Sequence, residues 1–173
     1  HTVSHYGDSD SIPAGDPGFK EFYLSRLEDV RLRGKRPDLL IFPNEITRET
    51  DLTGRTTEEL MPLVKSASTA IEVRSSKFEA LHYMRVKSER KSGKKLNDRD
   101  VPSFTVKIED LRIVYRWIEN HNVPQSYVQV FFDSIYALSI HDIFKIIASG
   151  SGFRLEKPDK SQGKNTIMIP ITS

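Results

Sequence analysis

The sequence predicts an α/β fold in which a mixed central β-sheet is flanked by helices on both faces. Three observations predict it. Short apolar segments rich in Leu, Ile, Val and Phe have the length of buried strands. Segments with apolar residues at helical spacing lie between them. The chain has 173 residues, enough for one well-buried domain and few for two. We therefore expect the strands and helices to share one core.

The first part of the chain predicts a helix and then a strand. Residues 1–18 are polar and then punctuated by Pro and Gly, so we expect an irregular segment there. Residues 19–173 are expected to form the single domain. Within it, helical spacing of apolar residues predicts a helix over 19–33, and Gly34 is a natural stop. A short apolar strand follows over 39–42.

Two capping-box signatures predict helix starts. Thr56-Thr57-Glu58-Glu59 opens one helix, because the Thr56 hydroxyl and the Glu59 carboxylate can satisfy free amides reciprocally. A strand is predicted over 69–74. After it, Ser76-Lys77-Phe78-Glu79 repeats the signature and predicts a helix from Lys77 to about Ser88.

The second half of the chain continues with alternating elements. Segments that are rich in β-branched residues, or in which apolar and polar residues alternate, predict strands. Segments in which apolar residues recur about every 3.6 positions predict helices. We expect the last strand to lie at a sheet edge, because Pro170 has no amide to donate to a ladder. The expected strands cover 103–106, 127–132, 135–138 and 165–171, and the expected helices cover 109–120 and 140–148.

Charge is concentrated in one stretch. The whole chain carries a net charge of +2, but residues 85–107 hold eight basic and three acidic residues, a net of +5. The remainder therefore carries −3. A basic segment on a slightly acidic body indicates an anionic partner, although a solvated loop rich in Lys has the same composition. Gly93 and Pro102 predict that residues 87–102 form an irregular basic loop.

Two carboxylates lie beside apolar strand segments, where a charge is costly without a partner. Asp38 precedes the strand over 39–42, and Glu72 lies within Ile71-Glu72-Val73-Arg74. If the two strands are neighbours, these carboxylates can share one Mg²⁺ ion, with the Val73 carbonyl as a further ligand. A metal-bound water of lowered pKa can then attack a phosphodiester.

The pattern Pro37-Asp38, followed 34 residues later by Glu72-Val73-Arg74, resembles the PD-(D/E)XK nuclease superfamily, in particular type II restriction endonucleases. The resemblance implies a restriction-endonuclease-like three-layer core and Mg²⁺-dependent hydrolysis of double-stranded DNA. The family usually has Lys where this chain has Arg74. Arg stays charged and cannot act as a base, but it can hold the scissile phosphate or stabilise negative charge. Lys77 is the second candidate for the missing ammonium.

The resemblance also assigns supporting roles. A restriction enzyme cutting both strands is expected to be a homodimer and to be cytoplasmic, which the lack of cysteine fits. Gln129 on a strand, and Glu21 and Glu28 on the first helix, are candidates for an outer shell around the metal. The candidate DNA contacts are Ser75, Ser76, Lys87, Arg90, Lys94, Lys95, Asn97, Arg99 and Lys107.

Two other interpretations remain open at this stage. The chain could be a catalytically inactive nucleic-acid-binding module with a nuclease-like fold, which the Arg74 departure favours. It could also be an ordinary α/β domain in which Asp38 and Glu72 form structural ion pairs with Arg36 and Arg74. The sequence has no zinc-ligand spacing, no phosphate-binding Gly loop and no Gly-x-Ser-x-Gly elbow. It contains no apolar run of membrane-spanning length and no signal peptide, so no membrane partner is expected.

Overall fold

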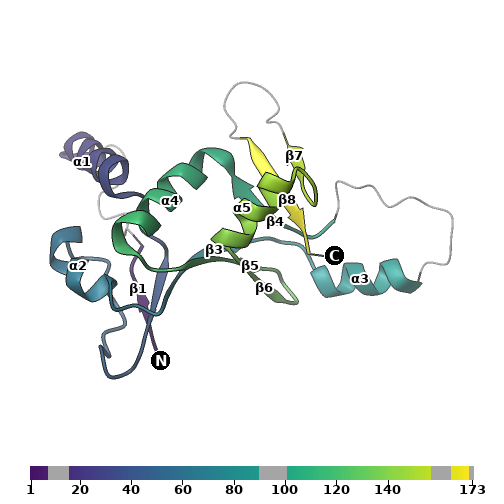
Figure 1. The fold of residues 1–173 in the computed structure, drawn as a ribbon, viewed down its shortest axis with the longest axis horizontal. Coiled ribbons are helices and arrows are strands. Elements are labelled where there is room, and N and C mark those ends of the chain that lie inside the picture. Colours follow the sequence, from purple (N-terminus) through teal and green to yellow (C-terminus); the bar gives the residue numbers. More distant parts are fainter. Residues whose placement is uncertain (8–15, 90–100, 157–164, 172–173) are drawn as a thin grey trace. The chain divides into compact units, whose positions relative to one another are not determined.

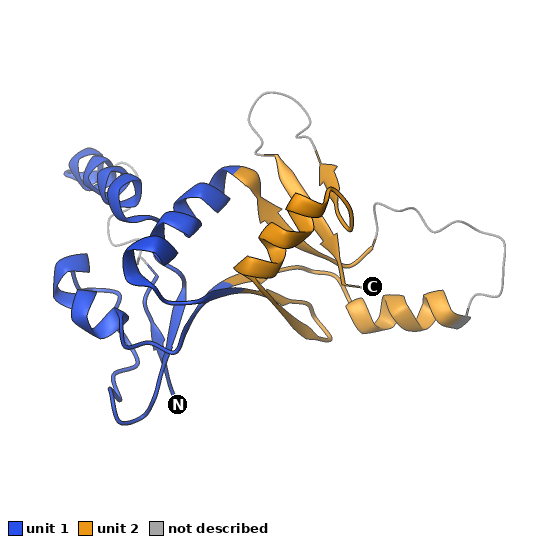
Figure 2. Cartoon of the chain, viewed as in Figure 1, with its two compact units in different colours: residues 1–72, 109–126 blue, residues 73–108, 127–173 orange. Residues whose placement is uncertain are grey.

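A computed structural model describes residues 1–7, 16–89, 101–156 and 165–171 (Figure 1). The chain divides into two compact units, coloured separately in Figure 2. Unit 1 comprises residues 1–72 and 109–126, and unit 2 comprises residues 73–108 and 127–173. The secondary structure is a mixture of helices and strands, which confirms the predicted α/β class.

A five-stranded sheet has the strand order β1-β2-β3-β5-β6. The antiparallel strands at its start are β1 (Thr2–His5), β2 (Leu39–Phe42) and β3 (Thr69–Ser75). Its remaining strands are β5 (Gln125–Val130) and β6 (Ile135–Ser139). The Ala70 amide donates to the Pro124 carbonyl and the Ser76 amide to the Val130 carbonyl. Both strands advance by six residues between these bonds, so β3 and β5 run parallel and the sheet is mixed, as predicted.

Unit 1 has its hydrophobic core on one face of β2 and β3. Its helices are α1 (Phe19–Arg33), α2 (Thr57–Val64) and α4 (Ile108–His121), the last of which begins one residue before the unit. Alternation along the strands sends Leu40, Phe42 and Ala70 into this core. Because these strand residues and the helix residues are all apolar, their burial holds the unit together. The cluster consists of Tyr6, Leu40, Phe42, Leu52, Leu60, Val64, Ala67, Ala70, Trp117 and Val123.

Unit 2 contains a second sheet that the sequence did not predict as separate. Its strands are β4 (Ser103–Lys107), β8 (Thr166–Pro170) and β7 (Arg154–Glu156), in the order β4-β8-β7. The expectation that β8 lies at an edge is wrong, because β8 is the central strand. Pro170 is tolerated because β7 pairs with β8 only from Thr166 to Met168, so no ladder amide is needed at Pro170 on that side.

Two helices in unit 2 begin differently from each other. Helix α5 (Ile140–Ser149) begins as expected, with the Ser139 hydroxyl accepting from the Asp142 amide. Helix α3 (Ala80–Glu89) begins three residues later than the second capping-box signature predicts. The Ser76 hydroxyl accepts instead from the Phe78 amide, 3.3 Å away, which makes a local turn.

The N-terminal segment also differs from expectation. Residues 1–18 were predicted to be irregular, yet they contain β1, which pairs with β2 along its whole length. The polar side chains of β1 gave no strand signal, and main-chain pairing with an apolar neighbour supplies the stability. No helix among the described residues is long and apolar enough to cross a membrane.

Candidate active site

The backbone register sets Asp38 and Glu72 opposite each other on neighbouring strands of unit 1. Leu39 pairs with Ile71 and Leu40 with Ala70 in the antiparallel β2–β3 ladder. Continuing this register by one residue places Asp38 across from Glu72, on the sheet face that carries Leu40 and Ala70. Opposed residues of an antiparallel pair have Cβ atoms about 5 Å apart. The expectation that the two strands are neighbours is therefore confirmed.

The N-terminal strand fixes the backbone at Asp38. The Asp38 carbonyl accepts hydrogen bonds from the amides of Tyr6 and Gly7, at 2.9 and 3.1 Å. Gly7 lies so close that a Cβ atom there would be 3.2 Å from the Asp38 Cα atom. The half-buried Asp38 is thus held between β1 and β3 at the start of β2.

Glu72 is 1% exposed, and its carboxylate forms an ion pair with the ammonium of Lys35. The Lys35 side chain is 31% exposed, so the ion pair joins a partly exposed cation to a buried carboxylate. A buried carboxylate needs such a partner, because its desolvation costs several kcal/mol. Lys35 is the one residue of this constellation that the sequence analysis did not identify.

The chain reaches Lys35 through a close crossing with α4. Gly34 has a φ of +89°, and a Cβ atom there would lie 2.3 Å from the Trp117 nitrogen and 2.4 Å from the Ile113 oxygen. The Lys35 amide then donates to the Ile113 carbonyl at 3.0 Å. Because only glycine fits this position, Gly34 both ends α1 and sets the direction of Lys35.

Arg74 lies two residues after Glu72 on β3 and belongs to unit 2. Its guanidinium lies over the ring of Tyr127, 5.9 Å from the centroid. The Arg74 carbonyl accepts a hydrogen bond from the side-chain Nε2 atom of Gln129 at 3.3 Å. Gln129 is 2% exposed, so this candidate for an outer shell is a buried residue whose side chain bonds to the backbone of β3. Val73, between Glu72 and Arg74, is half-buried.

Lys77 does not occupy the helix start that was predicted for it. It is exposed and precedes α3 by three residues. The Asp133 carboxylate caps this helix instead, accepting from the His82 amide at 2.9 Å and bonding to the amides of Ala80 and Leu81. Desolvation raises the pKa of Asp133, but the hydrogen bonds from these amides and from Ser134 together outweigh it, so the pKa lies below its usual value. Lys77 therefore does not lie at a helix start whose free amides would favour a phosphate, and the prediction of such a site at Lys77 is wrong.

The other predicted residues are spread over the chain. Glu21 and Glu28 are exposed on α1. Ser75 is exposed at the end of β3, Lys87 is exposed on α3, and Lys107 ends β4. The predicted contacts at Arg90, Lys94, Lys95, Asn97 and Arg99 lie outside the described residues.

The donor chemistry at Asp38 and Glu72 suits a hard divalent cation. Both side chains offer carboxylate oxygens, which Mg²⁺ prefers, and Mg²⁺ usually takes one or two protein carboxylates and keeps several waters. The described residues contain no group of three or more His, Cys, Asp or Glu that could enclose a metal. The pair therefore fits an ion that retains water and does not fit a closed structural metal site.

Comparison with known proteins identifies the family. The family model for AccI restriction endonucleases matches residues 1–93 and 82–173, which together span the sequence. The chain belongs to the AccI restriction endonuclease family. No curated protein and no solved structure matches it.

Membership of the AccI family assigns the chain to the type II restriction enzymes, which are site-specific DNA nucleases, and makes DNA its partner. This confirms the resemblance to restriction endonucleases at the level of the family. Type II restriction endonucleases generally use a divalent metal.

Proposed function

We propose that this AccI-family chain is a Mg²⁺-dependent type II restriction endonuclease of the PD-(D/E)XK kind. In this proposal Asp38 and Glu72 hold the metal, with the Val73 carbonyl as a further ligand. The observation that carries the proposal is the β2–β3 register, which opposes an Asp after Pro with a buried Glu. A bound Mg²⁺ would supply a water of lowered pKa and positive charge beside the scissile phosphate.

Lys35 is the residue that we propose for the ammonium of the site. It already neutralises Glu72, and its partly exposed side chain extends towards solvent. An ammonium at this position can orient a water or bind a phosphate oxygen when the carboxylate engages a cation. Arg74 stays charged and cannot act as a base, whereas the Lys35 ammonium can lose a proton, so we propose Lys35 for that role. Arg74 and Lys77 remain candidates for phosphate contacts.

The test is cleavage of plasmid DNA with Mg²⁺. Asp38→Ala and Glu72→Ala are each expected to reduce the cleavage rate by about 10³-fold or more, because the metal loses half of its carboxylate ligands. Glu45→Ala, at an exposed turn residue, is the matched control and should cleave like the wild type. Retention of cleavage by either site variant would overturn the assignment of the metal pair.

The three candidate cations can be ranked in the same assay. Lys35→Ala is expected to lower the cleavage rate by about 10²-fold or more with little change in DNA affinity measured in Ca²⁺. Lys77→Ala should chiefly weaken DNA binding. Equal cleavage by Lys35→Ala and wild type would contradict the role proposed for Lys35. DNA binding without cleavage by the wild type would favour an inactive DNA-binding module.

Cleavage of both strands of a duplex by one kind of site is simplest with two copies of the chain. We therefore propose a homodimer on DNA. Sedimentation of the chain with and without a duplex containing its site tests this directly, and a one-to-one complex that cuts both strands would contradict it.

A further inference from the structure

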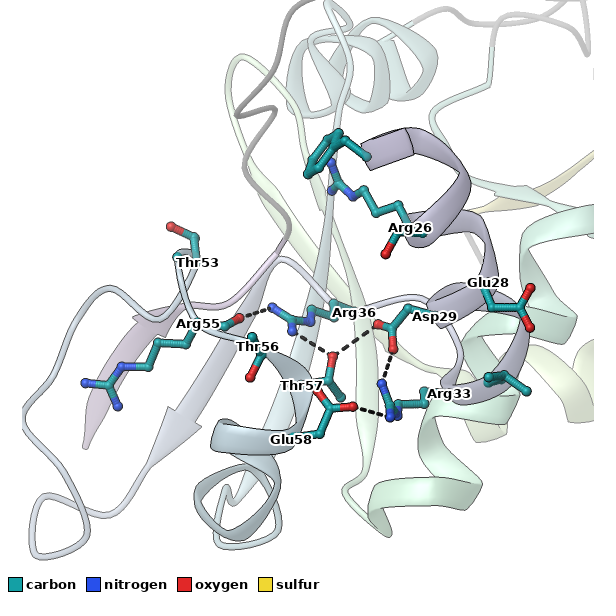
Figure 3. Close-up of a pocket in the computed structure, with 14 residues that line it drawn as sticks. Arg26, Glu28, Asp29, Arg33, Arg36, Thr53, Arg55, Thr56, Thr57 and Glu58 are labelled. Atoms are coloured by element: carbon teal, nitrogen blue, oxygen red, sulfur yellow. Dashed lines mark hydrogen bonds and ion pairs between the residues drawn. The ribbon is translucent and has the colours of Figure 1, made fainter. Parts of the chain in front are cut away.

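A pocket in each unit offers a different kind of chemistry. The pocket of unit 1 is polar, and its side chains bond to one another: Thr57 donates to Asp29 at 3.1 Å, and Arg33 pairs with the same carboxylate (Figure 3). The pocket of unit 2 has a volume of about 410 Å³ and a wall that is largely aromatic. We call it the aromatic pocket. Its apolar lining residues are Phe78, Tyr83, Val86 and Phe132.

Phe132 is the most exposed large apolar side chain in the described part of the chain, at 73%. It lies in the turn between β5 and β6, and it lines the aromatic pocket. A ligand that covers this ring removes apolar surface from water, which favours binding. The ring also offers an aromatic face, on which a flat ring of a ligand can stack.

The backbone that carries Phe132 is tied to the start of α3, which lies beside the β5–β6 turn (Figure 1). The Phe132 amide donates to the Phe78 carbonyl at 3.0 Å, and the adjacent Asp133 carboxylate accepts from the His82 amide at 2.9 Å. The rings of Phe78 and Tyr83 pack against each other, with centroids 5.6 Å apart. The pocket is therefore formed before a ligand arrives, so binding orders few further groups.

Positive charge accompanies the aromatic pocket. Lys77 lines it and is exposed, and Arg85 and Lys87 are exposed on α3. Residues 85–107, which begin within this helix, carry a net charge of +5. The charge favours an anionic ligand. It disfavours a second copy of the chain, because a symmetric contact through this surface would bring the same cations together.

We propose that the aromatic pocket takes a nucleobase of the bound DNA, which stacks on Phe132 while Lys77 binds a neighbouring phosphate. An aromatic face beside a cation is the arrangement by which proteins hold unstacked bases. In a duplex, the base has to leave the stack, and the contacts with Phe132 offset that cost. The inference deepens the proposed function and rests on its DNA partner, but it requires neither cleavage nor the metal pair.

The first experiment measures binding of the full chain, without divalent metal, to two single strands of about 12 nucleotides. One is oligothymidine, and the other is an abasic strand with the same phosphates. Stacking of a base predicts that the wild type binds oligothymidine about 5–100-fold more tightly. Phe132→Ala should remove most of this preference, whereas Phe132→Tyr keeps the aromatic face and should retain it.

Ile135→Ala is the matched control, because it removes another exposed apolar side chain, 68% exposed, from the same hairpin outside the pocket lining. It should keep the wild-type preference. Equal binding of the two strands by the wild type, or a full preference in Phe132→Ala, would overturn the base site. Cleavage of plasmid by the same wild-type protein would then leave the proposed nuclease function standing, so the two failures are distinguishable.

The second experiment tests the phosphate contact. Lys77→Gln should weaken binding of both strands equally and make the salt dependence shallower by about 0.7 units of slope. Lys145→Gln removes the same charge from an exposed position on α5 of the same unit and should leave the slope unchanged. A wild-type slope in Lys77→Gln would overturn the assignment of the phosphate to Lys77.

The third experiment examines the other possible occupant of the pocket, a second copy of the chain. Sedimentation without DNA compares the wild type with Phe132→Ala, and we expect the same oligomeric state for both. A dimer that dissociates in Phe132→Ala, together with equal binding of the two strands by the wild type, would show that Phe132 contacts another protein chain and would overturn the proposal.

Discussion

Glu72 and Arg36 are both buried charged residues of unit 1, and the protein accommodates them in different ways. Glu72 lies on a regular strand and is neutralised by an ammonium that reaches it from a connecting segment. Arg36 lies in that connecting segment, and a hydroxyl and a carbonyl fix its guanidinium. Lys35 and Arg36 are consecutive, yet Lys35 pairs with the buried Glu72 and Arg36 donates to Thr57 and to the Arg55 carbonyl.

The segment before β2 therefore positions two charged side chains that have different buried partners. Successive side chains of an extended segment point in opposite directions. Lys35 therefore extends to Glu72, while Arg36 extends to Thr57. The segment is anchored at one end by Gly34 against α4 and at the other by the hydrogen bonds to Asp38.

The largest expected effect comes from removing this anchor. Gly34→Ala should destabilise the protein by more than about 4 kcal/mol, because the new Cβ overlaps the α4 backbone and the positive φ is strained. Gly18→Ala is the matched control. Gly18 also has a positive φ, of +86°, but nothing lies within 4 Å of its Cβ position, so we expect about 1–2 kcal/mol. Chemical denaturation measures both, and similar losses would contradict the role of the crossing.

The second largest effect is expected from breaking the ion pair between Lys35 and the buried Glu72. Lys35→Met should cost about 2–4 kcal/mol, because it leaves the buried Glu72 carboxylate without this ammonium. Combining it with Glu72→Gln should restore much of the stability, while the cleavage rate should stay far below that of the wild type. Denaturation and cleavage are measured on the same preparations. A double variant as unstable as Lys35→Met would show that the ion pair does not explain the loss.

A smaller effect tests how Arg36 is held. Thr57→Val keeps the volume of this buried residue and removes the hydroxyl that joins Arg36 to Asp29. We expect the free energy of unfolding to fall by about 1–2 kcal/mol. Thr53→Val, which removes an exposed hydroxyl bonded to Asp51, should change stability by less than about 0.5 kcal/mol. Equal effects of the two variants would weaken the case for a preorganised Arg36.

The smallest effect concerns His121, a buried titratable residue of the same unit that has no ion pair among those described. Its Nδ1 atom lies 2.9 Å from the Trp117 carbonyl, and its ring stacks on Trp117. Burial is the main reason that its pKa lies below the ordinary value of 6.5. The unfolded chain therefore binds a proton first, and stability should fall as the pH drops below about 6.5.

His121→Gln should remove this contribution, so its melting temperature should fall less than that of the wild type between pH 7.5 and pH 5.5. In free energy of unfolding, the expected difference between the two proteins in this loss is about 1 kcal/mol or less. His82→Gln, at an exposed residue of α3, should keep the wild-type acid sensitivity. If both variants respond to pH like the wild type, the buried imidazole does not limit stability in acid.

The two capping-box signatures show how far local sequence can be trusted. Thr56 and Glu59 form the predicted box at the start of α2, with both reciprocal hydrogen bonds present. Ser76 and Glu79 have the same spacing but do not start α3, because Asp133 takes over the capping from a distant position in the sequence. A local motif predicts its structure only where no tertiary contact offers the same amides a better acceptor.

Periodicity and short apolar segments were enough to predict most helices and strands and the α/β class, and they singled out Asp38 and Glu72 as carboxylates beside buried strands. Only tertiary contacts determine that Asp38 lies opposite Glu72, which cation reaches Glu72, and that β8 is a central strand. Lys35 and Arg36 lie in a connection that is neither helix nor strand. The neighbouring sequence therefore has no periodicity from which the direction of their side chains could be predicted. Their partners are fixed only when Gly34 packs against α4 and the strands assume their register.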